Sequence, residues 1–291
     1  MSKKAVISIW LICLLVAAAT AVLSVNNVFA PLDIPEWLII ILLVVLSAFC
    51  EYIDSSLGMG YGTTLTPVLL TFGVVRIDIV PAILLSELLT GFFSGVAHHR
   101  EGNIDLLKNK SVRTTLYFLA LPSLAGVIIA TLLGTKLQSQ NYINLYIAIM
   151  IVCIGMYLIY SNFFVKKPKH SLSRIRLLLL GTVAAFNKGL SGGGYGPLMT
   201  GGQLTAGVKE KEAVAITSVC EGFTCLVGLI AFFMLGGKLN LFYAIPLCLG
   251  SMLSVIPAAK TIKILPEGML RKTIGWATLL LGLLVLYKYL N

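Results

Sequence analysis

GMGYG at residues 58–62 and GGGYG at residues 192–196 are two copies of one glycine-rich motif in this 291-residue chain, and they are the strongest indication of its fold. They lie 134 positions apart, and at the same offset Glu87 meets Glu221. A chance match between apolar segments does not easily explain a Gly-x-Gly-Tyr-Gly motif and an acidic residue at one offset. The sequence therefore predicts two repeats of one structural unit.

The composition around these motifs is that of an integral membrane protein. Apolar residues make up 58% of the chain, and charged residues make up 12%, about half the usual share for a soluble domain. Apolar runs of bilayer-spanning length recur along the chain and do not alternate with polar residues, so they predict helices rather than barrel strands. We expect an all-α polytopic membrane protein.

The repeats divide the chain into four parts. We predict an N-terminal transmembrane helix within residues 1–30, a first repeat over 31–165, a basic linker over 166–176 and a second repeat over 177–291. The first helix lies outside the repeated unit, and the same residues would also fit a cleaved signal peptide. Longer apolar segments are expected at 6–25, 36–57, 79–97, 114–134, 142–164, 177–190, 213–235, 241–258 and 272–289, with short ones at 63–72 and 197–206.

The distribution of basic residues predicts the orientation. If each Gly-rich stretch is a hairpin that enters and leaves on one side, about 17 of the 22 lysines and arginines share a side, which the positive-inside rule makes cytoplasmic. The N-terminus is then inside and the C-terminus outside. The hairpins enter from opposite sides, so the repeats are inverted, as in many secondary transporters. Parity leaves open whether each hairpin is re-entrant or consists of two short crossings.

The Gly-rich turns predict a substrate site. Glycine lets a ligand approach the main-chain amides closely, and the N-terminus of the short helix after each turn would attract an anion. Close helix packing is the alternative explanation of these glycines. The predicted substrate-binding residues are Gly58, Gly60, Tyr61, Gly62, Thr63, Lys188, Ser191, Gly192, Gly193, Gly194, Tyr195 and Gly196.

Charged residues within apolar sequence predict a coupling or support role. Lys188 has Asp54 as its repeat partner, and it would either pair with Asp54 or contact an anionic substrate, unless it reaches the interface by snorkelling. Glu87 and Glu221 each lie about 14 Å into a helix, near the bilayer midplane, where they would carry protons or support the hairpins. Glu51 lies one turn before Asp54 and could face the same cavity.

The remaining polar residues point to no other function. The net charge of +10 could suggest nucleic acid, but the basic residues flank apolar runs, so we expect no nucleic-acid partner. The six cysteines have no metal-ligand spacing, and we expect no cofactor or metal. His98, His99 and Arg100 predict a solvated cytoplasmic cluster, which leaves no histidine within the membrane. With no nucleophile–base pair expected there, we do not expect an enzyme, whereas an uncoupled anion channel stays open as an alternative to a transporter.

The duplicated Gly-rich motif with Glu87 and Glu221 downstream resembles the TauE/SafE sulfite-exporter family over about residues 36–289. The resemblance implies a multi-pass permease of a prokaryotic inner membrane. It also implies a small sulfur-containing anion, such as sulfite or the organosulfonate sulfoacetate, moving outward. Protons are a further expected partner. Of the family's functional positions, only the Gly-rich turns and their neighbours are carried over to this chain.

Overall fold

The structure is a computed structural model that describes residues 35–58, 60–105, 108–136, 140–164, 174–205 and 208–261, with residues 276, 279–280, 282–283, 286–287 and 290 near the C-terminus. Every regular element among these residues is helical, which confirms the predicted all-α class. The predicted first helix over 6–25, residues 166–173 of the linker and most of the predicted helix over 272–289 lie outside the described residues.

The described residues form helices close to the predicted segments. Five of them are long and apolar enough to cross a bilayer, namely α2, α4, α5, most of α9 and α10. The helices in chain order are α2 (Glu36–Leu57), α3 (Tyr61–Thr71), α4 (Arg76–Arg100), α5 (Lys110–Lys136), α6 (Gln140–Phe164), α7 (Arg174–Ser191), α8 (Tyr195–Thr205), α9 (Glu210–Met234) and α10 (Leu241–Thr261).

Glycine turns separate α2 from α3 and α7 from α8. Gly58 (φ 66°) and Gly60 (φ 149°) form the first turn, and Gly192 (φ 75°) and Gly194 (φ 79°) form the second. Residues with a Cβ rarely adopt these φ values, so each turn depends on glycine. The short helices α3 and α8 have 11 residues each, or about 16 Å, roughly half the thickness of a bilayer core.

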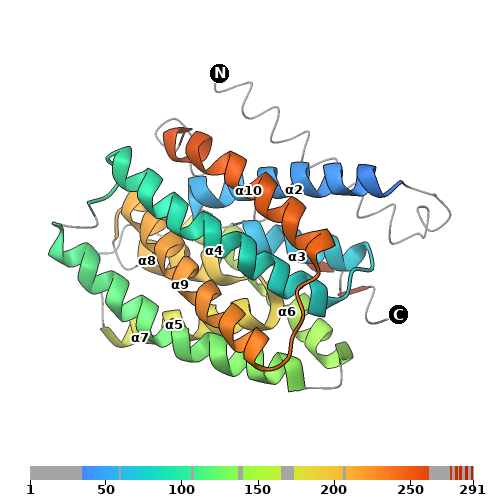
Figure 1. The fold of residues 1–291 in the computed structure, drawn as a ribbon. Coiled ribbons are helices and arrows are strands. Elements are labelled where there is room, and N and C mark those ends of the chain that lie inside the picture. Colours follow the sequence, from blue (N-terminus) through green and yellow to red (C-terminus); the bar gives the residue numbers. More distant parts are fainter. Residues whose placement is uncertain are drawn as a thin grey trace.

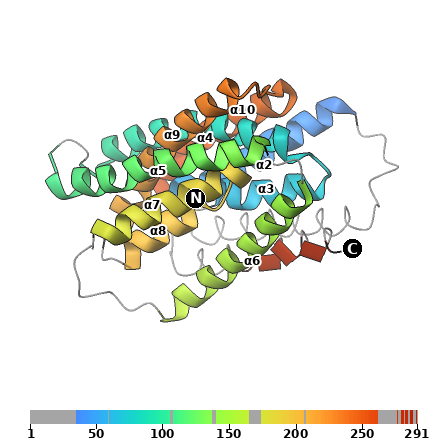
Figure 2. The same ribbon diagram turned by 90° about the horizontal axis from the view of Figure 1, so that it is seen from below.

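The two helical hairpins approach each other from opposite ends of the molecule. In both views α3 lies toward one end and α8 toward the other (Figures 1 and 2). The end with residues 98–105, 108–113 and 208–212, here called the basic end, lies at the left of Figure 1. The connections 72–75 and 235–240 lie at the other end, here called the opposite end.

Helix packing is matched between the two halves. The most extensive contacts join α2 to α10 and α5 to α7, followed by α4 to α9, α4 to α10 and α5 to α9. Exchanging α2 with α7, α3 with α8, α4 with α9 and α5 with α10 leaves this pattern unchanged, and these pairs correspond at or near the 134-residue offset. This is the pattern that two inverted repeats would produce, although the repeat boundaries stay a prediction.

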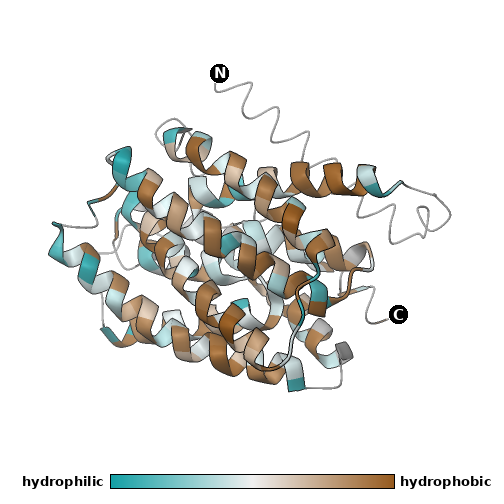
Figure 3. Ribbon diagram, in the orientation of Figure 1, coloured by the Kyte–Doolittle hydropathy of each residue, from teal (hydrophilic) through white to brown (hydrophobic). Residues whose placement is uncertain are grey.

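The outer surface of the bundle is apolar. Brown colouring predominates along the helices in Figure 3, and hydrophilic residues gather mainly at helix ends, above all at the basic end. Large apolar side chains such as Leu121, Ile245 and Leu253 are exposed. Exposed apolar side chains along membrane-length helices are suited to contact with lipid tails.

The prediction for His98 was wrong. The apolar run ends at about residue 97, but α4 continues to Arg100 and buries His98 completely. The ring is covered because its Nε2 lies against the Ser55 carbonyl of α2, and because Asn103, which bonds to its Nδ1, also donates to α10. The expectation that no histidine would lie within a membrane helix is corrected at the same position.

Candidate substrate and coupling site

The two Gly-rich turns meet inside the molecule. We call Gly58 with residues 60–63 the first tip, and residues 191–196 the second tip. A Cβ on Gly62 would lie 1.9 Å from the carbonyl oxygen of Gly192, and one on Gly193 would lie 2.5 Å from the carbonyl oxygen of Gly62. Such distances are far below van der Waals contact, so the tips pack backbone against backbone, which only glycine permits.

Two threonines join the tips across their contact. Thr66 Oγ1 donates to the Ser191 carbonyl at 3.0 Å, and Thr200 Oγ1 donates to the Gly58 carbonyl at 2.7 Å. Thr66 and Thr200 are themselves 134 positions apart. Neither threonine was among the predicted site residues, although extending the repeat by one helical turn beyond each glycine motif relates the two.

The amides at the tips are occupied by oxygens of the protein. Gly193 N donates to Ser191 Oγ at 3.0 Å, and Gly194 N donates to Thr63 Oγ1 at 3.3 Å. In the first tip, Tyr61 N donates to Asp54 Oδ1 at 3.4 Å. These are the amides at which the sequence predicts an anion. In this conformation each of them donates to a hydroxyl or carboxylate oxygen of the protein instead.

Lys188 occupies the centre of the charged site. Its Nζ donates to a carboxylate oxygen of Glu87, from α4, and to Glu221 Oε1, from α9, at 2.8 Å. The lysine side chain is 1% exposed, so it does not snorkel to an interface. Lys188 forms salt bridges with the two glutamates rather than with its repeat partner Asp54.

Asp54 lies beside Lys188 and the two glutamates. Among the described residues, it forms no salt bridge with the lysine. Its carboxylate and those of Glu87 and Glu221 lie within 4.8 Å of one another. We call Asp54, Glu87, Lys188 and Glu221 the central cluster. Three carboxylates at this spacing could share a cation. The Lys188 ammonium already serves as that cation for Glu87 and Glu221.

A fourth buried carboxyl group borders the central cluster. Glu51 accepts hydrogen bonds from Ser55 Oγ at 2.6 Å and from Thr90 Oγ1 at 3.1 Å. Each buried ion costs several kcal/mol unless it is paired. One ammonium cannot balance four carboxylates, so the site is suited to holding protons or other cations together with Lys188.

The two tyrosines of the tips are anchored to the surrounding helices. The Tyr61 hydroxyl bonds to Ser47 Oγ at 2.9 Å and Ser86 Oγ at 2.7 Å. The Tyr195 hydroxyl has longer bonds of 3.3 Å to side chains of α5 and α9. Both rings are buried. In this conformation the hydroxyls hold the tips in place, and a direct role in binding substrate stays a prediction.

The structure thus brings most of the predicted site together, with partners that the sequence did not predict. Gly196 is also buried, in the first turn of α8. The unpredicted partners are hydroxyl side chains on helices distant in the chain: Ser47, Thr66, Ser86, Thr90, Ser123, Thr200 and Thr224. Apart from Thr66 and Thr200, which the repeat relates, sequence alone gives little signal for them, because serine and threonine are common in membrane helices.

Comparison with known proteins places this geometry in a family. The sulfite exporter TauE/SafE family matches residues 42–285, which include both tips and the central cluster. The probable membrane transporter protein YtnM of Bacillus subtilis (strain 168) is 31% identical over 191 residues, 64% of this chain and 61% of that protein. The aligned part therefore spans less than two thirds of the relative. No solved structure matches the chain. The family match confirms the resemblance seen in the glycine motifs: the chain belongs to the sulfite exporter TauE/SafE family, whose members are membrane transporters and not enzymes.

Proposed function

We propose that this transporter exports a small sulfur-containing anion, such as sulfite or an organosulfonate, from a prokaryotic cell by alternating access. The anion would bind to the Lys188 ammonium at the contact between the two tips. The observation that carries the proposal is this buried ammonium, held by Glu87 and Glu221 next to Asp54, which accepts a hydrogen bond from the Tyr61 amide of the first tip. The family description supplies the class of substrate.

Binding of the anion would compete with binding of the carboxylates. Lys188 has three N–H donors, and two of them are directed at Glu87 and Glu221. An anion that replaces one glutamate leaves a buried carboxylate without its partner, and taking up a proton removes that unpaired charge. The exchange therefore binds an anion and a proton together.

Movement of the tips would complete the site. The amides of Gly193 and Gly194 are occupied by Ser191 and Thr63 oxygens while the tips touch. Separation of the tips would free the Gly194 amide, because its acceptor belongs to the other tip. Two hairpins that enter from opposite ends allow the site to open toward either face in turn.

The charge that accompanies the anion determines the driving force. A monovalent anion moving outward alone gains about 2.3 kcal/mol per 100 mV of membrane potential, inside negative. An anion that moves outward with one proton gains nothing from the potential, and its export is favoured only when the combined concentration gradients of anion and proton are directed outward. An uncoupled anion channel would respond to the potential alone, so the two drives distinguish a coupled transporter from a channel.

Ligand binding to purified protein tests the role of Lys188. Sulfite and sulfoacetate should raise the thermal unfolding temperature of the wild type, since a ligand at about 100 times its Kd stabilises the folded state by about 2.7 kcal/mol. The K188Q variant should lose this stabilisation. K209Q removes an exposed lysine and should keep it.

The folding of the variant needs its own control, because K188Q leaves both glutamates without a cation. The double variant K188Q/E87Q removes one charge of each sign and should fold without binding the anion. An unchanged ligand-induced shift in folded K188Q/E87Q protein would remove Lys188 from the substrate site.

A further inference from the structure

Two buried basic side chains lie at opposite ends of α4, outside the central cluster. Arg76 is the first residue of the helix, at the opposite end, and His98 lies in its last turn, at the basic end. Arg76 is 4% exposed and His98 is 0% exposed. The sequence predicts a solvated His98, and neither residue has a part in the transport cycle described above.

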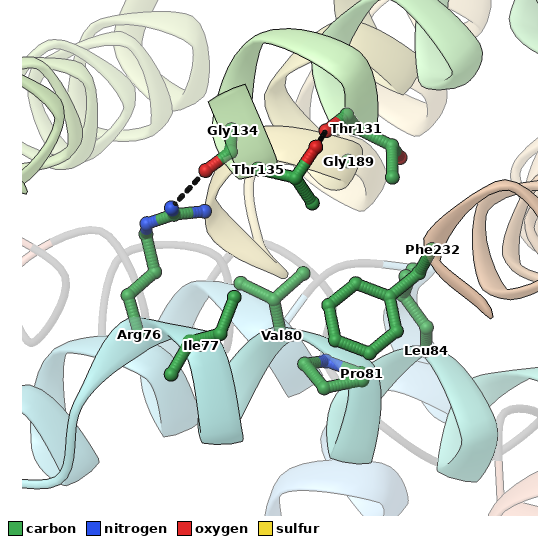
Figure 4. A pocket seen from close by; sticks show the side chains of 10 residues that line it. All are labelled: Arg76, Ile77, Val80, Pro81, Leu84, Thr131, Gly134, Thr135, Gly189 and Phe232. Atoms are coloured by element: carbon green, nitrogen blue, oxygen red, sulfur yellow. Dashed lines mark hydrogen bonds between the residues drawn. The ribbon is translucent and has the colours of Figure 1, made fainter. Parts of the chain in front are cut away.

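Arg76 bonds to two helix ends. Its Nη1 donates to the Leu190 carbonyl at 3.2 Å, and its Nη2 donates to the Gly134 carbonyl at 2.5 Å. Leu190 belongs to the last turn of α7, directly before the second tip, and Gly134 belongs to the last turn of α5. Figure 4 shows the guanidinium reaching from α4 toward Gly134. A cation at two helix C-termini is favoured by both helix dipoles.

His98 makes the corresponding connection at the basic end. Its Nε2 lies 2.9 Å from the carbonyl oxygen of Ser55, in the last turn of α2, directly before the first tip. Its Nδ1 lies 3.0 Å from Asn103 Nδ2, which also donates to the Ala259 carbonyl near the end of α10 at 3.1 Å. His98 and Asn103 thus connect α4 to α2 and α10.

The two connections correspond under the internal exchange of the halves. Arg76 holds α7 and α5, and His98 holds α2 and α10, which are the matching pairs of helices. The position 134 residues after His98 is Phe232, and Phe232 lines the small pocket beside Arg76 (Figure 4). An apolar ring therefore occupies the position in the second half that corresponds to His98. Arg76 makes the polar contacts to α7 and α5 at this end instead.

The hydrogen bonds around His98 assign its tautomer. The Ser55 and Ala259 carbonyls can only accept, so His98 Nε2 carries a hydrogen and the Asn103 amide presents its NH₂ group. His98 Nδ1 must then accept from that NH₂ group, which requires a neutral ring. A proton on Nδ1 would place two donors against each other and remove the connection to α10.

A pocket at the basic end borders this connection. Asn103 lines a pocket of about 650 Å³ together with His99, Asp105, Lys209, Lys211 and Glu212. The titratable groups next to the His98 ring on its own segment are His99, which bonds to the Ile104 carbonyl, and Glu101 in the following turn. From α2 and α10 it faces carbonyl oxygens, and the exposed Lys260 is the charged residue nearest to Ala259 in the chain.

We propose that Arg76 and His98 are the two gate residues of the transporter, each holding one broken helix closed at one end, and that protonation of His98 opens the gate at the basic end. The proposal rests on the alternating access proposed above. Histidine ordinarily titrates between pH 5 and 8, so the gate at the basic end would respond to pH, whereas the permanently charged Arg76 gate would not.

Cysteine labelling tests the gate at the basic end without any substrate. Ser94 is buried one turn behind His98 and bonds to Ser55 and Ser218. In a background without the six native cysteines, S94C would be labelled by a membrane-impermeant methanethiosulfonate reagent added to the basic end, which inside-out vesicles expose if this end is cytoplasmic. The control is the S94C/H98Q variant, because glutamine can donate to Ser55 and accept from Asn103 but does not titrate.

The ratio of labelling rates at pH 6 and pH 8 separates gating from thiol chemistry. The ratio should be about fivefold to tenfold higher with His98 than with H98Q, the effect expected when one hydrogen bond between neutral groups is lost. N103A should be labelled faster than the parent at pH 8, with the same ratio as H98Q. Equal ratios with His98 and H98Q would overturn the pH-sensitive gate.

The second gate has a matching test from the other face. Thr131 is buried beside the Arg76 pocket, so T131C should be labelled faster from the opposite end in R76Q than in R76K, with the same ratio of rates at pH 6 and pH 8 in both variants. Equal labelling in both variants would overturn the Arg76 gate. Because no anion is present, a failure here is distinct from a failure of the proposed export, which the ligand-binding experiment detects.

Discussion

Replacement of Gly62 by alanine should impair the closed contact between the tips. The added Cβ would lie 1.9 Å from the Gly192 carbonyl oxygen. Moving this contact to 3.0 Å, below which real Cβ contacts are essentially never found, separates the tips by about 1.1 Å. Overpacking of a tight interior costs about 1–3 kcal/mol. Only the state in which the tips touch bears this cost, so its population should fall by roughly 5- to 150-fold.

The effect should appear as a lower rate of transport rather than as unfolding. We expect the initial rate of sulfite flux into proteoliposomes, per folded protein, to fall by at least about fivefold in G62A. G193A should behave alike, because its Cβ would lie 2.5 Å from the Gly62 carbonyl oxygen. The double variant should be less impaired than the product of the two single effects, since both relieve the same contact.

A glycine outside the tips provides the control. Gly73 has a φ of 83° and nothing within 4 Å of the position of a Cβ, so alanine there adds backbone strain without a clash. G73A should lower the unfolding temperature and leave the turnover rate unchanged. Wild-type flux in G62A would refute the claim that the tips close against each other during transport.

Three further substitutions test the supports of the site. Tyr61→Phe should destabilise the protein more than Tyr195→Phe in thermal unfolding, because the Tyr61 hydroxyl bonds at 2.7 and 2.9 Å and the Tyr195 hydroxyl at 3.3 Å; the reverse order would contradict the anchoring role. Thr200→Val leaves the Gly58 carbonyl without this donor and should cost about 1–3 kcal/mol of stability, with slower flux; an unchanged unfolding temperature would contradict this contact. Gly250→Ala places a Cβ 2.1 Å from a carbonyl oxygen of α2 and should lower the yield of folded protein, and a normal yield would contradict the close packing of α2 and α10.

The fold could be predicted well because its determinants are local. Apolar runs of membrane length gave the long helices, and the glycine motifs gave the two turns. The 134-residue offset related Tyr61 to Tyr195 and Glu87 to Glu221. These signals depend on neighbouring residues or on one repeated motif, and neither requires knowledge of how the helices pack.

The partners within the site could not be predicted, because packing chooses them. A salt bridge between Lys188 and its repeat partner Asp54 was one of the expected alternatives, but the lysine pairs with glutamates 101 and 33 residues away. Both are placed by the way α4 and α9 cross. The same reason explains the error at His98, which follows an apolar run and resembles a loop residue until α2 and α10 cover it.

Flux of sulfite in proteoliposomes under an imposed pH gradient, with the membrane potential clamped at zero, tests the central claim most directly. We expect saturable flux in the wild type and in K209Q, and we expect the pH gradient to accelerate it. K188Q should abolish this flux. Sulfite flux in the wild type that ignores the pH gradient, or flux in K188Q equal to that of the wild type, would contradict an anion and a proton exchanging at Lys188.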